Sequence, residues 1–214
     1  VRLPVDYNVF EDESGRAIEK GFQLVEKVVM WAKKNNLDII IDFHKAYGYD
    51  FNNVDKEGGP RNNLFDAKNL QDRFIQLWER IAYYFTKYNN VAFELLNEVV
   101  EEKNAATWNM LIARTVMAIR KYAPDHKIIY GGIAWNSAST VKLLGRPIDN
   151  NCIFTFHFYE PIVFTHQKAY WVPGIEQVGE VFYPDTMEMY KKKSSFFEVK
   201  QGLNVMRSRL DGDM

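Results

Sequence analysis

A carboxylate stands directly after one of the most apolar stretches of the chain. The segment VAFELLNEVVE, residues 91–101, begins as an apolar run and then places Asn97 and Glu98 before two further valines. A charged side chain is costly to bury unless it has a partner. Glu98 is therefore either a polar cap after a strand or an acid that the strand holds in a cavity. This stretch alone leaves both interpretations open.

Polar side chains close the other apolar runs as well. These runs are VRLPVDY (1–7), LDIIIDFH (37–44), VAFELLNE (91–98), KIIYGGIAW (127–135) and CIFTFHFYE (152–160). If these runs are parallel strands, their carboxyl ends lie together around one opening, the mouth of the barrel. The polar residues expected there are Arg2 with Asp6, His44 with Lys45, Asn97 with Glu98, Trp135 with Asn136, and His157 with Tyr159 and Glu160. A single member such as His44 has an ordinary structural interpretation, but five polar ends together favour a site at this mouth.

Helical patterns separate the apolar runs. Residues 17–34, 66–88 and 105–122 carry apolar side chains at spacings of three and four. The apolar runs are continuous, as in strands buried on both faces, and strand–helix–strand repetition predicts right-handed crossovers in a parallel sheet. Beyond residue 137 we expect a short helical piece within 137–150, a long loop over 161–190 and a last helix around 186–210.

Composition excludes several classes of protein. The 214 residues carry a net charge of -1 with 27 Lys and Arg against 28 Asp and Glu, which gives no basic face for nucleic acid. No stretch is long and apolar enough to span a membrane. One cysteine, Cys152, rules out an internal disulfide framework. The sequence has neither GxGxxG after the first strand nor GxxxxGK[ST], the two glycine-rich phosphate-binding motifs. Their absence favours a (β/α) barrel over a nucleotide-binding fold.

Several quoted motifs resemble one family. FELLNE and the downstream FTFHFYEP, preceded by VRLPVDY and DFHKAYG, look like glycoside hydrolase family 5, a group of retaining β-glycanases on (β/α)8 TIM barrels. The likeness covers about residues 1–170 in order and spacing. It implies an α/β fold of about five β/α units, strands two to six of the barrel. The chain departs from the pattern at Val99, where family members usually have proline.

The resemblance also implies roles for the residues at the strand ends. Glu98 ends the fourth barrel strand and is the general acid/base, which must be kept protonated to donate to the leaving oxygen. The substrate-binding positions are Arg2, which ends the second strand and orients a catalytic carboxylate, His44, Asn97, Trp135, His157 and Tyr159. Asn97 would donate a hydrogen bond to the sugar 2-hydroxyl. Trp135 either offers a face to a sugar ring or fills the rim, and we interpret Glu94 as a structural ion partner and Glu160 as a loop or rim residue. No metal or cofactor is implied.

The family's second carboxylate has no obvious counterpart here. The nucleophile belongs in a Gly-Glu context on the seventh strand, but the only such pair is Gly179-Glu180, about 20 residues after Glu160 without an intervening helix. We therefore expect residues 1–214 to form a single partial barrel domain that lacks strands one, seven and eight and the nucleophile. Its exposed sheet edges would favour a homo-oligomer.

Three hypotheses for function remain. The first is a retaining endo-β-1,4-glucanase, a cellulase-like enzyme acting on a β-linked oligo- or polysaccharide. The second is an inactive carbohydrate-binding or structural remnant of the same barrel. A metal-dependent hydrolase using His44, His157 and Glu98 is disfavoured, because these residues are scattered singly over strands. Glucan, mannan and xylan are not distinguished. No signal peptide is recognised, and for the intact protein we expect secretion or a cell-surface location.

Overall fold

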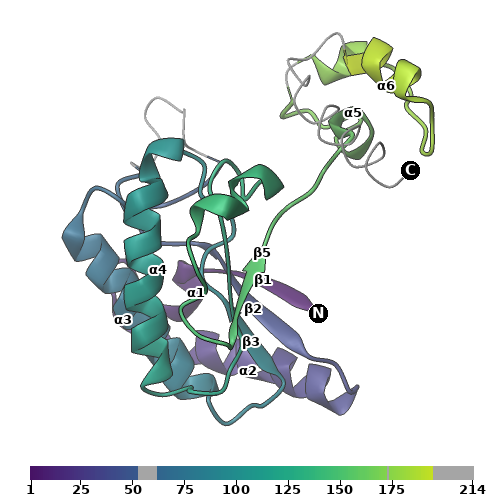
Figure 1. The fold of residues 1–214 in the computed structure, drawn as a ribbon. Helices are drawn as coiled ribbons and strands as arrows, with labels where there is room; N and C mark the ends of the chain where they lie inside the picture. The colour runs from purple at the N-terminus through teal and green to yellow at the C-terminus, as the bar shows by residue number, and fades with distance from the viewer. Residues whose placement is uncertain (53–61, 173, 195–214) are drawn as a thin grey trace. The chain divides into compact units, whose positions relative to one another are not determined.

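The computed structural model describes residues 1–52, 62–172 and 174–194. The chain divides into two compact units, Val1–His157 and Phe158–Met214, which are described separately below (Figure 1).

A parallel sheet forms the centre of the larger unit. Within the described ranges it has five strands, β1 (Arg2–Asp6), β2 (Ile39–Lys45), β3 (Val91–Glu94), β4 (Ile128–Gly131) and β5 (Cys152–Thr155). Every neighbouring pair is parallel, and the order in space is β1-β2-β3-β4-β5, the order in the sequence. When every strand–helix–strand connection between adjacent strands has the same handedness, all the helices lie on one face of the sheet. This is the arrangement of a (β/α) barrel.

Helices cover one face of the sheet. The helices of this unit are α1 (Tyr7–Phe10), α2 (Glu19–Lys34), α3 (Lys68–Phe85) and α4 (Ala105–Arg120), with 3-10 turns η1 (Glu102–Asn104) and η2 (Ala138–Leu143). The three predicted long helices and the short helical piece after residue 137 are confirmed. Trp78 of α3 is fully buried against the rings of Phe43 and Phe93, with centroids 5.7 and 5.8 Å away.

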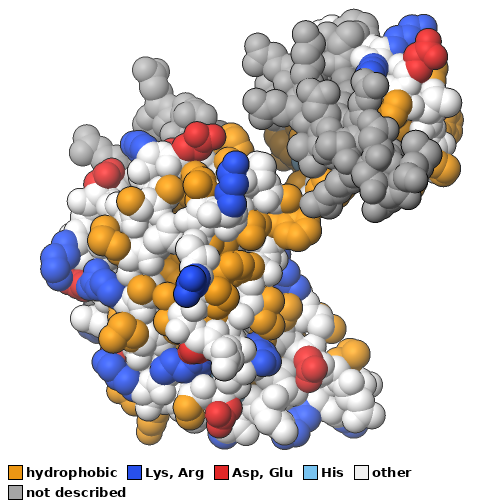
Figure 2. Space-filling model, viewed as in Figure 1, with side chains coloured by type: hydrophobic (Ala, Val, Ile, Leu, Met, Phe, Trp, Pro, Cys, Tyr) orange, Lys and Arg blue, Asp and Glu red, His pale blue; other side chains and the backbone are white. Residues whose placement is uncertain are grey.

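The opposite face of the sheet is less covered. Side chains alternate between faces along a strand, and the register aligns Arg2 with Ile40, Ile40 with Ala92, and Asp42 with Glu94. Ile153, next in line on β5, is 43% exposed, whereas Ile39 and Ile41 on the helix side are fully buried. Figure 2 shows hydrophobic side chains gathered in a patch on the larger unit, with charged ones at its border. Five strands do not close a barrel, so this face is open.

The strands end earlier than the apolar runs predict. β3 ends at Glu94 and β4 at Gly131, so Glu98 and Trp135 lie four residues beyond a strand end rather than on it. Leu95 and Leu96 are buried although they follow the strand, so the apolar run reflects core packing and not strand pairing. The placement of Arg2 at a strand end was wrong, because Arg2 is the first residue of β1.

The smaller unit holds short elements around its own core. They are α5 (Ile162–Thr165), η3 (Ile175–Gln177) and α6 (Met187–Ser194). Buried side chains of this core include Val163, Ile175 and Tyr190. The predicted loop over 161–190 thus contains helical turns, and the predicted last helix is α6 up to Ser194, the remainder lying outside the described residues. In the described part of the chain no helix is long and apolar enough to cross a membrane.

Candidate active site

Glu98 meets a histidine from a different strand end. Its Oε1 lies 2.6 Å from Nδ1 of His157, which follows β5 by two residues. Glu98 is only 8% exposed. Parallel strands bring their carboxyl ends to one edge of the sheet, which explains how residues 59 positions apart come into contact. The prediction that Glu98 and His157 share one edge of the sheet is therefore confirmed.

Arg2 ties two strands to the residue before Glu98. Its guanidinium donates to both oxygens of Glu94 at 2.7 and 3.0 Å and to Oδ1 of Asn97 at 2.8 Å. Oδ2 of Asp42 lies 3.0 Å from the same guanidinium. Glu94, Asp42 and Asn97 are buried, so one arginine organises three polar groups away from water. Because Oδ1 of Asn97 accepts from Arg2, the orientation of the amide is fixed and its nitrogen can donate to a ligand.

His44 is oriented by a buried carboxylate. Nδ1 of His44 lies 2.7 Å from Oδ2 of Asp42, which is fully buried. A carboxylate at Nδ1 holds the proton on that nitrogen, so Nε2 is the ring atom available to a ligand. The ring of Phe51 packs edge-on against the imidazole, with centroids 5.1 Å apart. Oδ1 of Asp42 is buried without a hydrogen-bond partner in the described part of the chain.

The segment after β4 forms a turn with unusual backbone angles. Ala134, Trp135 and Asn136 all have φ between 51° and 55°, a left-handed conformation that bulky residues rarely adopt. Oδ1 of Asn136 accepts from the amide of Gly132 at 3.0 Å, and a Cβ on Gly131 would lie 1.9 Å from that oxygen, so this position requires glycine.

This turn connects Trp135 to the Glu98 segment. The amide of Trp135 donates to the carbonyl of Val99 at 3.2 Å, and the amide of His157 donates to the carbonyl of Asn136 at 2.8 Å. The Trp135 side chain is 54% exposed. A strained turn held by hydrogen bonds to Gly132, Val99 and His157 is typical of functional sites, and here it ties the backbone of Trp135 and of His157 to the segment that carries Glu98.

Two residues of the predicted set belong to the smaller unit. Tyr159 and Glu160 follow the boundary at His157, so the structure gives no position for them relative to Glu98. Glu160 lies in a loop, as predicted, and burial raises the pKa of its carboxyl group. Glu180 is exposed and lies between η3 and α6 in no strand, as expected for a pair that does not start a barrel strand.

Sequence reasoning missed Asp42 and classified Glu94 correctly. Glu94 is the ion partner of Arg2, as predicted. Asp42 carried one signal, a charge within the apolar run IIIDFH two residues before His44, so that both point to the same face. Among the described residues no group of three or more His, Cys, Asp or Glu could hold a metal ion.

Comparison with known proteins identifies the family. A sequence profile described as Cellulase (glycosyl hydrolase family 5) matches residues 1–205. Cellodextrinase A of Ruminococcus flavefaciens is 42% identical over 176 residues, which cover 82% of this chain and 51% of that protein. Endoglucanase C of Acetivibrio thermocellus is 38% identical over 214 residues, or 97% of this chain and 61% of that protein. The chain belongs to glycosyl hydrolase family 5 and spans 51% to 61% of the length of these two relatives.

Solved structures agree with the family. Thermotoga maritima Cel5A in complex with mannotriose is 27% identical, with a TM-score of 0.69 over 91% of this chain and 61% of that chain. The cellulose synthase subunit Z of Clostridioides difficile is 25% identical, with a TM-score of 0.72 over 97% of this chain and 65% of that chain. The predicted partial (β/α)8 barrel is confirmed by this likeness and by the parallel sheet.

Proposed function

We propose that this chain is the central part of a retaining endo-β-1,4-glucanase in which Glu98 is the general acid/base. The observation that carries the proposal is the contact between Glu98 and His157 beside the Arg2–Asn97 pair. Both arrangements lie at the edge of the sheet where (β/α) barrels carry out their chemistry. Relatives named endoglucanase and cellodextrinase favour β-linked glucose chains as substrate.

Glu98 would exchange a proton with the leaving oxygen. Cleavage of a glycosidic bond needs an acid that protonates the leaving group, and the same residue later activates water as a base. Glu98 is 8% exposed and so shielded from bulk water, and in the described part of the chain its carboxyl has one side-chain hydrogen-bond partner, His157. Because His157 holds Oε1, Oε2 is the oxygen that we propose exchanges the proton with the leaving group.

The neighbouring groups would position the sugar. Asn97, with its oxygen held by Arg2, presents its amide nitrogen to the 2-hydroxyl, an interaction that strengthens in the transition state. His44 offers Nε2 to a second hydroxyl. Trp135 offers an exposed ring to the apolar face of a sugar, and Tyr159 is proposed as a further positioning donor.

The attacking carboxylate is proposed to come from a part of the protein that these 214 residues do not include. Retaining enzymes place it about 5 Å from the acid, on the opposite side of the sugar ring. Two observations support this source: the chain spans 51% of one relative's length, and Arg2, in register with Ile40 on the less covered face of the sheet, has a side chain that is 34% exposed. The alternative is a remnant that binds sugar without turnover, and what supports it is that Gly179-Glu180 lies in no strand of the described residues.

Activity of the intact protein that contains this chain tests the proposal. Reducing-sugar release is measured on soluble β-1,4-glucan, mannan and xylan, with Glu98→Gln as the paired variant. The proposal expects release from glucan that Glu98→Gln abolishes while the melting temperature is retained. Binding of glucan without release by the unmodified protein would support the remnant, and release only from mannan or xylan would contradict the substrate.

A further inference from the structure

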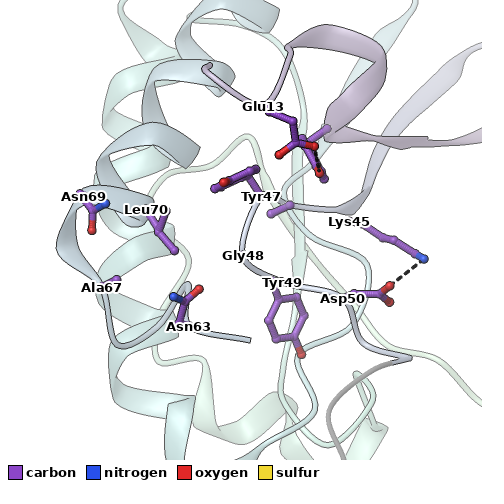
Figure 3. Close-up of a pocket in the computed structure, with 12 residues that line it drawn as sticks. Glu13, Lys45, Tyr47, Gly48, Tyr49, Asp50, Asn63, Ala67, Asn69 and Leu70 are labelled. Carbon is purple, nitrogen blue, oxygen red and sulfur yellow. Dashed lines mark hydrogen bonds and ion pairs between the residues drawn. The ribbon is translucent and has the colours of Figure 1, made fainter. Parts of the chain in front are cut away.

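Asn136 ends the left-handed turn that follows β4. Its φ is 55°, and Ala134 and Trp135 before it have φ of 51° and 55°. Residues with a Cβ are strained in this region of backbone angles, whereas glycine adopts it freely. The turn after β2, which lines a pocket of about 660 Å³, reaches a positive φ at Gly48 (Figure 3). The turn after β4 thus keeps side chains where glycine would be easier, which indicates a use for them.

The side chain of Asn136 stabilises this turn. Asn136 is fully buried, and its Oδ1 accepts from the amide of Gly132 at 3.0 Å. Its Nδ2 is buried without a hydrogen-bond partner in the part of the chain that the structure describes. A buried donor without a partner destabilises a fold, so such a group is expected where function requires the residue. The hydroxyl of Thr140 ties the same turn, because it donates to the carbonyls of Ile133 and Ser137 at 2.8 and 2.9 Å.

The turn holds the backbone of the histidine that contacts Glu98. The carbonyl of Asn136 accepts from the amide of His157 at 2.8 Å, and Ser137 and His157 form an isolated parallel bridge. β5 ends at Thr155, so these contacts extend the pairing beyond the end of the strand. Nδ1 of His157 in turn lies 2.6 Å from Oε1 of Glu98. The place where the imidazole meets Glu98 therefore depends on the shape of the turn.

We infer that Asn136 is a positioning residue for proton donation by Glu98. By closing the left-handed turn it sets the backbone of His157, and His157 holds one oxygen of the Glu98 carboxyl. The inference rests on the proposed function and adds to it a buried residue that acts through His157. Reacting groups must be held within about 0.5 Å, and a misplacement of about 1 Å can slow a reaction about 100-fold. Loss of the Asn136 side chain should consequently slow the step that needs the proton more than the other steps.

Leaving-group dependence tests this with the intact protein that contains this chain. The variant is Asn136→Gly, which keeps the left-handed backbone accessible and removes the hydrogen bond to Gly132. Its kcat/KM on an aryl cellobioside with a poor leaving group should fall about 30-fold, but only about threefold with a good leaving group, which departs without protonation. This ratio is diagnostic, because a variant that only lowers the fraction of folded protein lowers both rates equally.

Asn36→Gly is the matched control. Asn36 is exposed, has a φ of 56° and lies in the turn before β2, at the opposite end of the sheet, so the same substitution there should leave both rates unchanged. Thr140→Val removes the hydroxyl that donates within the turn and keeps the shape of the side chain. It should change the ratio in the same direction by about threefold, and it decides the question if Asn136→Gly does not fold.

The outcomes separate this inference from the proposed function when Glu98→Gln is measured on the same two substrates. If Glu98→Gln acts selectively on the poor leaving group, a selective loss in Asn136→Gly supports the inference. Equal losses on both substrates in Asn136→Gly, no loss on either, or the same change of ratio in Asn36→Gly would overturn it while the proposed function stands. If Glu98→Gln loses both rates equally, or the unmodified protein cleaves neither substrate, the proposed function fails and the role of Asn136 falls with it.

Discussion

Two clusters of charged residues in the larger unit differ in composition: one has two arginines around one buried carboxylate, and the other has one arginine beside two buried carboxylates. The Glu11 cluster consists of Glu11, Arg73 and Arg80, and each arginine binds one oxygen of a carboxylate that is 1% exposed, at 2.7 and 2.8 Å. The Arg2 cluster consists of Arg2, Asp42, Glu94, Asn97 and His44, where one guanidinium faces two buried carboxylates.

The two clusters differ in how completely their carboxylate oxygens are hydrogen-bonded, and this distinguishes a structural contact from a functional site. In the Glu11 cluster both carboxylate oxygens are bound, and the spare donors reach the backbone carbonyls of residues 12, 13 and 15, so the loop after β1 is closed onto α3. In the Arg2 cluster Oδ1 of Asp42 is buried without a partner in the described ranges, and the Arg2 side chain is 34% exposed. Buried polar groups without partners are costly, so they persist where a function needs them.

The largest effect is expected from Arg2→Met. This change leaves Asp42 and Glu94 buried beside each other without their cation and releases Asn97. We expect a loss of about 3 kcal/mol in the free energy of unfolding and a fall of about 100-fold in kcat/KM on glucan, because Asn97 is displaced. Denaturant unfolding and initial-rate kinetics measure both. Activity per folded molecule equal to that of the unmodified protein would show that the cluster is structural only.

A matched pair of substitutions sharpens the contrast. Glu94→Gln and Glu11→Gln each replace a buried, arginine-bound carboxylate by an amide of the same shape, and each should cost about 2 kcal/mol of stability. Only Glu94→Gln should lower kcat, by about tenfold, because only its arginine holds Asn97. The measurement is kcat at a temperature where all three proteins are folded. A decrease of similar size in both variants would remove the distinction between the clusters.

A third, more exposed contact should have the smallest effect. Arg120 binds Asp149 at 2.7 Å and holds the pKa of that carboxyl down at about 2. A depressed carboxyl pKa stabilises the fold above the unfolded-state value of about 4 and stops doing so as the pH falls toward 2. Because Asp149 is partly exposed, Asp149→Asn should cost about 1 kcal/mol at neutral pH.

The pH dependence of unfolding checks this contact. The difference in stability between Asp149→Asn and the unmodified protein should shrink between about pH 4 and pH 2 and be constant above pH 5. A difference that is the same at pH 2 and pH 7 would show that the substitution acts through packing rather than charge.

The helices and strands could be predicted from the sequence because their buried side chains leave a pattern of apolar residues. Periodic apolar side chains located α2, α3 and α4 within a few residues, and continuous apolar runs located all five strands of the described sheet. The strand ends were not predictable, because Leu95 and Leu96 are buried by the core without pairing in the sheet. The short elements α5 and η3 were missed, since four- and three-residue turns leave no periodic signal.

The site residues that lie within a family motif could be predicted from the sequence. Contacts that depend on the length of a side chain or on which strands pair could not. Glu98 and His157 follow from the family motifs, and the structure brings them to 2.6 Å. Arg2 was placed at the wrong end of its strand, yet its long side chain still reaches Asn97. Asp42 carried one sequence signal, its charge within an apolar run, but its contacts with Arg2 and His44 could not be predicted because they depend on how neighbouring strands pair.

The central claim is that Glu98 donates a proton to the leaving oxygen, and leaving-group dependence tests it most directly. The measurement is kcat/KM of the intact protein and of its Glu98→Gln variant on two aryl cellobiosides, one with a poor and one with a good leaving group. The account predicts a loss of about 1,000-fold on the poor leaving group and less than about tenfold on the good one, which departs without protonation. Equal losses on both substrates, with an unchanged melting temperature, would contradict the assignment of Glu98 as the acid.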